Sequence, residues 1–485
     1  MGEANSSALG FEFNGAVKAE GAPNHLTGDA GVLVIRELDD RLGLTSGLAL
    51  QVADPRNPAF VIHPMVELLR SRLYAMAQGH RDQDDLDRLR DDPALRIAVS
   101  ERRGTAPLGP GEPLEPDGLA SQPTQSRLIE TLSDLGNLRV LRRAVFEWPG
   151  KLLRAQKLLP LPAATLDVDS TPIEVHGQQQ GSAKNGYYHM TCYHPLAVIL
   201  HETGDFLDVK LRSGTAHTAE GVVEFMLPLI DRARKELSPK VQVRGDAGMP
   251  SESLLAPLEK RNTPYAFRLA NNAVLKRMAE PYLRRPAGRP PSTPRIWTHE
   301  LEYQATEGKV PWSRPRRVVL VVLEKPGEIF LDYFFLLTNW TAKEKPGAEL
   351  LEFYRQRGTM EGHLGELKSV LAPALSCASR RKTHVGGEPP KSVKSTPRSD
   401  VAANEATLLL FVLSYNLLNA ARRVLSATCP AESQWSLERM RTWLLRVPAR
   451  ITRTKRRAIF QLNEGAHDLW RRFLAAIARL APAPS

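Results

Sequence analysis

The spacing of hydrophobic residues predicts that the N-terminal part of the chain is helical. In residues 28–100 apolar residues recur three and four positions apart, and the breaker DPRNP at 54–58 interrupts them. This period is typical of amphipathic helices, so we predict a mainly helical N-terminal domain over 1–102. Residues 103–122 are rich in Pro and Gly and have no apolar period, which predicts a linker. Residues 123–162 are predicted to form a helical connector.

Beyond residue 163 the period becomes alternating, which predicts strands. Strands are predicted at 164–170, 189–202, 206–214, 240–246 and 264–270, and helices at 219–237 and 251–261. Three successive strands followed by alternating helices and strands are typical of an α/β fold. A Pro-rich break and further β-rich runs predict an insertion over 271–340, after which a helix begins near Pro346.

The most apolar stretch, residues 406–421, is predicted to be a buried core helix. Polar residues interrupt it at Thr407, Ser414, Asn416 and Asn419, and it is too short to span a membrane comfortably. With 42% hydrophobic residues and a mean hydropathy of −0.30, the composition is typical of a soluble globular protein. We expect a cytoplasmic location, because the three cysteines form no CxxC pair and the first residues lack a signal-peptide pattern.

Basic residues are concentrated near the C-terminal end. The chain has a formal net charge of +11, and residues 380–485 hold 19 basic against 7 acidic residues, so this segment carries the entire excess. Residues 380–400 predict a flexible basic loop, and residues 429–485 predict a basic region that suits a polyanion such as nucleic acid. The stretch with the highest density of basic residues is predicted to form either a strand pair that lies along DNA or a solvated edge. Its basic residues are Arg446, Arg450, Arg453, Lys455, Arg456 and Arg457.

Four residues with functional side chains share one face of the helix predicted after the insertion. Tyr354, Arg357, Glu361 and Lys368 fall within an arc of roughly 60° at about 100° per residue. Glu366 is predicted to point away from this face. Glu361 is either a functional carboxylate or one half of a structural ion pair with Arg357. An adjacent apolar stripe is predicted to be buried: Phe353, Met360, Leu364, Leu367 and Leu371.

Further carboxylates favour a functional role for Glu361. Asp167 and Asp169 lie on the same side of the strand 164–170, and Asp246 lies where another strand runs into a glycine turn. Carboxylates from these elements can converge on one site, where they repel one another unless a cation neutralises them. Oxygen ligands select Mg²⁺ or Mn²⁺, so the pattern predicts a divalent metal site, with Asp167 and Asp169 both open as ligands.

These residues also match the signature of a known family. Tyr, two residues, Arg, three residues, Glu, six residues and Lys is the Y-R-E-K pattern, and Tyr354, Arg357, Glu361 and Lys368 meet every spacing. The sequence resembles the DDE transposases of bacterial insertion sequences that carry this signature, most closely the insertion-sequence family numbered thirteen-eighty. Further stretches that resemble the family include LDVDSTPIEVHGQQ, NGYYHMTCYHPL and VRGDAGM, and the resemblance runs from about residue 26 to the C-terminal arginines.

The resemblance implies an α/β fold with an RNase H-like catalytic core. That core would comprise residues 163–270 and 341–428, with the β-rich insertion 271–340 between them and the helical N-terminal domain before them. In this class the insertion can supply an aromatic residue that stabilises a flipped base, here Trp297 or Trp312, and the alternative for both is a place in the core.

The resemblance also implies the site residues and their cofactor. The catalytic, metal-binding residues would be Asp169, Asp246 and Glu361, and they would hold two Mg²⁺ or Mn²⁺ ions. Asp167 is the alternative to Asp169 as the first aspartate. The implied DNA-binding residues are Tyr354, Arg357 and Lys368. Family members usually carry Ser and Phe where this chain has Ala247 and Met249, so the packing beside Asp246 is expected to differ.

The implied activity is cut-and-paste transposition by metal-dependent cleavage and strand transfer at terminal inverted repeats. The expected partner is double-stranded DNA, bound by a homodimer in the cytoplasm or at the nucleoid. Two alternatives remain: a catalytically silent DNA-binding relic of a transposase, and an RNase H-like nuclease without strand transfer. The sequence has no P-loop, dinucleotide fingerprint, GxSxG elbow or HExxH helix, which argues against the other common enzyme classes.

Overall fold

The computed structural model of the chain divides into two compact units. One comprises Met1–Thr131 with Ala420–Ser485, and the other comprises Leu132–Asn419. The residues that the structure describes are 9–19, 25–102, 105–108, 118–177, 179–289, 291–306, 310–377, 400–454 and 457–483. Each unit has its own core and is considered by itself.

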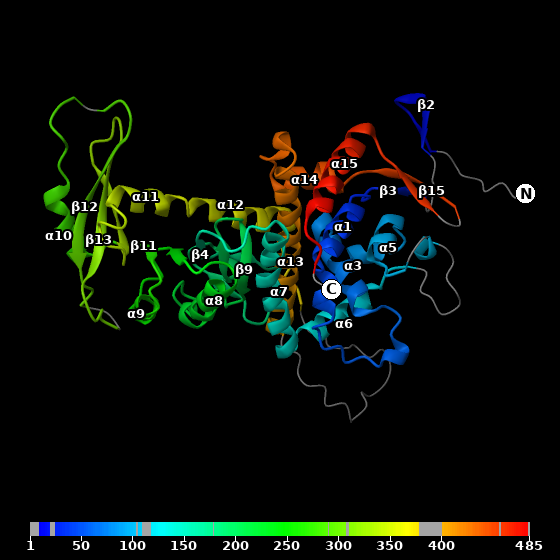
Figure 1. Cartoon of the computed structure of the whole chain (residues 1–485), viewed down its shortest axis with the longest axis horizontal. Helices are drawn as coiled ribbons and strands as arrows, with labels where there is room; N and C mark the ends of the chain where they lie inside the picture. Colours follow the sequence, from blue (N-terminus) through cyan, green and yellow to red (C-terminus); the bar gives the residue numbers. More distant parts are fainter. Residues whose placement is uncertain are drawn as a thin grey trace, which may run out of the picture. The chain divides into compact units, whose positions relative to one another are not determined.

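The central unit is built on one eight-stranded sheet (Figure 1). Its strand order is β12-β13-β14-β11-β10-β4-β8-β9. β4 is parallel to β10 and β10 to β11, whereas all other neighbours are antiparallel. The strands are β4 (Ala164–Ser170), β8 (Leu196–Leu200), β9 (Asp205–Lys210), β10 (Val241–Gly245), β11 (Tyr265–Leu269), β12 (Arg295–Tyr303), β13 (Arg316–Glu324) and β14 (Asp332–Thr338).

Helices and a small sheet complete this unit. The small sheet has the order β5-β7-β6, with β5 (Ile173–Glu174), β6 (Ala183–Asn185) and β7 (Met190–Tyr193). The helices are α7 (Leu135–Ala155), α8 (Val222–Glu236), α9 (Glu252–Lys260), α10 (Ala273–Ala279), α11 (Gly347–Arg355), α12 (Gly358–Glu366), a π-helix at Leu367–Leu371, and α13 (Asp400–Ser426) as far as the unit boundary. Figure 1 shows α11 and α12 following one another from the β12–β13 side of the sheet to α13.

The alternating pattern of β4 decides which face of the sheet carries chemistry. Leu166 and Val168 are fully buried and belong to the core that also contains residues of α8 and α9. Asp167 and Asp169 therefore lie on the opposite face, as their spacing predicted. On that face α11 contributes Leu350, Leu351 and Phe353 to a second core with β11, β13 and β14.

The single strand predicted at 189–202 is wrong, because the chain changes sheet in the middle of it. β7 ends at Tyr193 in the small sheet, and β8 begins at Leu196 in the large one. Pro195 lies at the break, where it has no N–H to donate to a ladder. Its carbonyl still accepts the N–H of Thr171 at 3.2 Å, which keeps the two segments beside the end of β4.

The β-rich runs between residues 271 and 340 extend the large sheet. β14 pairs with β11 in an antiparallel ladder, and β13 and β12 follow outward. The carboxyl ends of the parallel strands β4 and β10 therefore lie in the interior of the sheet, away from its two edges.

The predicted core helix at 406–421 is confirmed. α13 is long and apolar enough to cross a membrane by length and composition alone, but 83% of its most apolar 18-residue segment is buried inside the protein. Its polar residues have partners there. Asn416 accepts a hydrogen bond from the Phe206 N–H at 2.9 Å and donates to the carbonyls of Phe206 and Val145 at 2.8 and 3.2 Å. α13 is therefore fixed to β9 and α7 by an internal amide.

Replacing Asn416 with Leu is expected to lower the free energy of unfolding by about 2–4 kcal/mol, because buried backbone groups of Phe206 and Val145 would lose their partner. Urea denaturation of the purified chain measures this change. A loss below about 0.5 kcal/mol would mean that water replaces the amide, contrary to the prediction.

The other unit joins the beginning and the end of the chain. Its small sheets are β1-β2 and β16-β15-β3, in which β3 pairs with β15. The strands are β1 (Leu9–Phe11), β2 (Asn14–Ala19), β3 (Leu26–Thr27), β15 (Ala449–Arg453) and β16 (Ala458–Gln461). The helices are α1 (Val32–Leu42), α2 (Thr45–Ala49), α3 (Met65–Gln78), α4 (Asp85–Arg88), α5 (Pro93–Val99), α6 (Gln122–Leu132), α14 (Leu437–Met440), a π-helix at Arg441–Leu445, and α15 (Glu464–Arg479).

Candidate active site

Two of the predicted carboxylates emerge side by side from the centre of the large sheet. In the parallel ladder of β4 and β10, Val168 pairs with Gly245. The next residues are Asp169, which is next to last in β4, and Asp246, which directly follows β10, so both lie at the carboxyl ends of adjacent parallel strands. Within the described part of the chain, no basic side chain lies within 4 Å of the Asp246 carboxylate.

Asp167 is occupied by a buried ion pair. It accepts hydrogen bonds from Nε and Nη2 of Arg244 at 2.6 and 2.8 Å, and both residues have an exposed fraction of 0%. Arg244 also donates to the Phe353 carbonyl at 2.5 Å. Burial raises the pKa of Asp167, although Arg244 opposes this effect. This carboxylate ties β4 to β10 and α11 and has no face open to a substrate.

Arg357 lies among the remaining carboxylates. Its Nη2 donates to Oδ2 of Asp169 at 2.6 Å, and its Nη1 lies 3.9 Å from Oε1 of Glu361. Burial alone would lower the pKa of Arg357, but the neighbouring carboxylates, Asp169 first, raise it. Its buried Nε has no hydrogen-bond partner among the described residues. The guanidinium is therefore buried, charged and only partly satisfied.

The single helix predicted through these residues is wrong, because it is interrupted before Arg357. α11 ends at Arg355, and α12 begins at Gly358. The Arg357 N–H bonds to the carbonyl of Tyr354 three residues back, as in a tightened turn. Glycine has low helix propensity, so Gly358 favours such a break. Arg357 occupies the N-cap position of α12, makes no capping hydrogen bond with its side chain, and is directed at Asp169.

The side chains of the predicted face differ in exposure. Glu361, in the first turn of α12, has 72% of its side chain exposed, whereas the Arg357 side chain has only 9%. Lys368 is exposed on the π-helix, and Tyr354 is half-buried at the end of α11. Burial raises the pKa of Tyr354, while Arg357 opposes the rise. Glu361 and Lys368 can therefore meet a partner from solution without any repacking.

The apolar stripe beside these residues is confirmed, since all five of its members are buried: Phe353, Met360, Leu364, Leu367 and Leu371. Glu366, which was predicted to point away from the face of Tyr354, Arg357, Glu361 and Lys368, contacts α13. Its Oε2 accepts a hydrogen bond from the Tyr415 hydroxyl on α13 at 3.3 Å.

Tyr188 is a neighbour of the carboxylates to which the sequence pattern assigned no role. It precedes β7, and its ring packs edge-on against that of His194 with centroids 5.9 Å apart. Burial raises the pKa of Tyr188, and the negative charges of Asp169 and Asp246 raise it further. The signal available in the sequence was the aromatic cluster NGYYH just before a strand.

The carboxylates suit a hard divalent cation by their chemistry. Burial raises the pKa of Asp169, and Asp246 and Glu361 add to this effect while Arg357 opposes it. Like charges that raise a carboxyl pKa are typical of groups that need a cation. In this structure the guanidinium of Arg357 supplies the positive charge, and the described residues contain no group of three or more His, Cys, Asp or Glu side chains close enough to hold a metal ion.

Two of the other predicted residues lie in or against the hydrophobic core. Trp312 is buried and packs edge-on against Tyr303 with centroids 5.5 Å apart, so the core interpretation holds for it. Trp297 is partly buried and packs against the same core.

Two of the C-terminal basic residues lie on a strand pair, which is common to both alternatives for this region. β15 and β16 are antiparallel, and Arg450 and Arg453 are exposed on β15. Lys455 and Arg456 lie outside the described residues, as does the predicted basic loop at 380–400 apart from its last residue.

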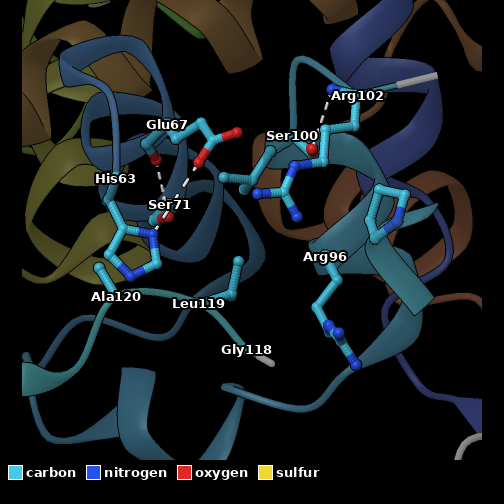
Figure 2. Close-up of a pocket in the computed structure, with 11 residues that line it drawn as sticks. His63, Glu67, Ser71, Arg96, Ser100, Arg102, Gly118, Leu119 and Ala120 are labelled. Atoms are coloured by element: carbon cyan, nitrogen blue, oxygen red, sulfur yellow. Dashed lines mark hydrogen bonds and ion pairs between the residues drawn. The ribbon is translucent and has the colours of Figure 1, made fainter. Parts of the chain in front are cut away.

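A pocket in the other unit does not have the size of a substrate site. Figure 2 shows His63, Glu67 and Ser71 on one side and Arg96 and Arg102 on the other. His63 Nδ1 lies 3.9 Å from Oε2 of Glu67, and the Ser71 hydroxyl donates to the Glu67 carbonyl at 2.7 Å. The cavity measures about 30 Å³, enough for a water molecule or two. The carboxylates at the ends of β4 and β10 remain the candidate site.

Comparison with known proteins identifies the family of the chain. The family profile for the transposase DDE domain, group 1, matches residues 10–385 and 391–484. No curated protein matches the sequence. A solved structure of a piggyBac transposase synaptic complex with hairpin DNA is similar at 14% identity and a TM-score of 0.37, over 85% of this chain and 79% of that one. The chain belongs to the family of transposases with a group 1 DDE domain.

Proposed function

We propose that this transposase moves an insertion sequence by a cut-and-paste mechanism and that it belongs to the Y-R-E-K class, close to the family numbered thirteen-eighty. The observation that carries the proposal is the juxtaposition of Asp169 and Asp246 at adjacent strand ends, with Arg357 paired to Asp169 and Glu361 one turn along α12 beside Arg357. The strand order β9-β8-β4-β10-β11 around these acids supports an RNase H-like core, with β12–β14 as the insertion.

Asp169, Asp246 and Glu361 are the proposed catalytic residues, and they would hold two Mg²⁺ or Mn²⁺ ions. When bound, such ions lower the pKa of the attacking water or hydroxyl and neutralise charge on the scissile phosphodiester. Three observations favour these acids over Asp167: Asp167 is sealed by Arg244, Asp169 lies at the strand end, and Glu361 is exposed. Hydrolysis at the end of the element would free a 3′-hydroxyl, which then attacks a phosphodiester of the target.

Arg357 would change partner when DNA binds. Its pair with Asp169 screens the repulsion among the carboxylates in the absence of other cations. Its buried, unpartnered Nε and its fixed place at the start of α12 suit it to bind a phosphate close to the scissile bond. Tyr354, which precedes Arg357 in the sequence, and the exposed Lys368, which follows it, would contact the DNA backbone.

The expected substrate is double-stranded DNA that ends in terminal inverted repeats, with a homodimer holding two such ends. The exposed arginines of β15 support a basic DNA contact at the C-terminal end of the chain. The predicted division into helical N-terminal domain, linker, connector, core, insertion and basic C-terminal region belongs to this proposal.

An excision assay tests the proposal. A plasmid carries a marker between the inverted repeats that flank this gene, and loss of the marker is scored in Mg²⁺ and with an excess of chelator. We expect excision in Mg²⁺ and at least about a hundredfold less without a divalent ion, because neutralisation of phosphodiester charge supplies several kcal/mol.

Two outcomes would favour the alternatives. Binding of the repeats in a gel shift without excision would point to a DNA-binding relic. Cleavage of the ends without joining them to a target plasmid would point to a nuclease. Strand-transfer products in Mg²⁺ would exclude both.

A further inference from the structure

The C-terminal part of the chain contains a second site with the chemistry of nucleic-acid binding. A cavity of about 320 Å³ lies between the segment Leu437–Leu445 and the start of α15. Two tryptophans and three arginines line it, together with Glu432: Trp435, Trp443, Arg439, Arg446 and Arg472. This volume is at the lower end of the roughly 300–1,000 Å³ of ligand pockets, and it suits a group about the size of one nucleotide.

Trp443 is the available aromatic surface in this cavity. Its exposed fraction is 60%, and within the described part of the chain it has no ring partner. By contrast, Trp470 on α15 is buried and donates its indole N–H to the Leu444 carbonyl at 3.1 Å. Trp443 therefore contributes little to the local core, and its ring can stack on a planar ligand.

The charges in the cavity favour an anion. The guanidinium of Arg439 lies over the Trp435 ring at 5.4 Å and has no carboxylate partner among the described residues. Arg446 is held by its Nε, which donates to the Gln78 carbonyl at 2.9 Å. Glu432 is the only carboxylate among the lining residues, and Arg472 neutralises it at 3.1 Å. Two arginines thus remain for a ligand that is both aromatic and negatively charged.

We propose that this cavity binds one unpaired nucleotide of a DNA strand, with the base stacked on Trp443 and its phosphate held by Arg439 and Arg446. The inference rests on the proposed function, since a transposase brings DNA to the protein. A duplex covers the faces of its bases by stacking, so only an unstacked base can present its face to an indole ring.

Continuity with β15 favours a DNA strand over a free nucleotide. Pro448 lines the cavity, and β15 starts at the next residue, Ala449, with Arg450 and Arg453 exposed along it. If one base of a DNA strand occupied the cavity, the phosphates next to it could contact these two arginines. A free nucleotide would make no use of these arginines.

Fluorescence anisotropy of a labelled 12-nucleotide oligothymidylate, titrated with the full chain, tests the inference. Trp443→Ala is expected to weaken binding about tenfold or more, because a stacked base is lost. Trp443→Phe keeps a ring and should stay within about threefold of wild type, yet lose the quenching of tryptophan emission on binding. Arg439→Gln should lower the slope of log affinity against log salt by about 0.7, the value for one phosphate on a single strand.

The control is Arg471→Gln, which removes an exposed arginine of α15 that does not line the cavity. It should leave the tryptophan quenching unchanged. The inference is overturned if Trp443→Ala binds the oligonucleotide as wild type does, or if Trp443→Phe loses as much affinity as Trp443→Ala. It is also overturned if thymidine monophosphate binds as tightly as the oligonucleotide, because the site would then serve free nucleotides.

A parallel assay separates this inference from the proposed function. Cleavage of duplex ends in Mg²⁺ depends on the carboxylates of the central unit and can be followed with the same protein samples. If the wild-type protein cleaved duplex ends and Trp443→Ala bound the oligonucleotide as tightly as wild type, the nucleotide site alone would be refuted. Lack of cleavage together with a clear loss of oligonucleotide binding in Trp443→Ala would refute the catalytic proposal alone.

Discussion

Replacing Glu361 with Gln is expected to abolish DNA cleavage while DNA binding is retained. The substitution keeps the size of the side chain but removes the charge that the proposed ions require, and loss of several kcal/mol of transition-state stabilisation slows cleavage about a thousandfold or more. The folded state should hardly change, because 72% of the Glu361 side chain is exposed and its pair with Arg357 is long at 3.9 Å. Cleavage of end-labelled duplex in Mg²⁺, and a gel shift on the same DNA, measure the two properties separately.

Glu352 offers a matched control on the neighbouring helix. Its side chain is 66% exposed on α11, where it pairs with Arg355 at 2.7 Å. Glu352→Gln should therefore leave both cleavage and binding close to wild type. If Glu361→Gln cleaved DNA as fast as Glu352→Gln, Glu361 would be the structural partner of Arg357 and the catalytic assignment would be wrong.

Replacing Asp167 with Asn is expected to destabilise the protein by about 3–5 kcal/mol, because it leaves the fully buried charge of Arg244 without a counter-charge. The pair connects β4 to β10, and Arg244 also holds the Phe353 carbonyl of α11, so the loss should reach the centre of the sheet. Urea denaturation of the purified variant gives the change in the free energy of unfolding.

Asp169→Asn is the matched variant two residues along the same strand. Its carboxylate lies near the strand end with 19% of its side chain exposed, and other carboxylates remain near Arg357, so removal of its charge should cost about 1–3 kcal/mol, less than in Asp167→Asn. Cleavage, however, should fall as far as it does in Glu361→Gln. If Asp167→Asn were stable but inactive and Asp169→Asn were active, Asp167 would be the catalytic residue and Asp169 would not.

Much of the fold near the site was predictable from local patterns. The alternation in ATLDVDS predicted a strand with its acids on one face, and β4 spans those seven residues. The polar residues within the stretch 406–421 predicted a core helix and not a membrane span, and one of them, Asn416, bonds α13 to β9 and α7. Such patterns are informative because the side chains of a strand or helix alternate faces with a fixed period.

The failures arose where a single residue interrupted the regular geometry that the local period assumes. The run 189–202 alternates like one strand, yet Pro195 divides it between two sheets. The helix around Arg357 has a continuous apolar stripe, yet it breaks where the guanidinium reaches Asp169. A periodicity argument assumes regular geometry, so it could not locate either break.

The sequence by itself identified the residues that we propose for the chemistry, because the spacing of Tyr354, Arg357, Glu361 and Lys368 and the two aspartate motifs can be recognised without coordinates. It could not distinguish Asp167 from Asp169, since a period of two places both on one face. Only the tertiary structure decided their difference. The parallel register of β4 and β10 sets Arg244 opposite Asp167 and Asp246 beside Asp169, so one acid is neutralised inside the sheet while the other is left at its end. The physical reason is that strand pairing joins residues 77 positions apart, and no local pattern contains that distance.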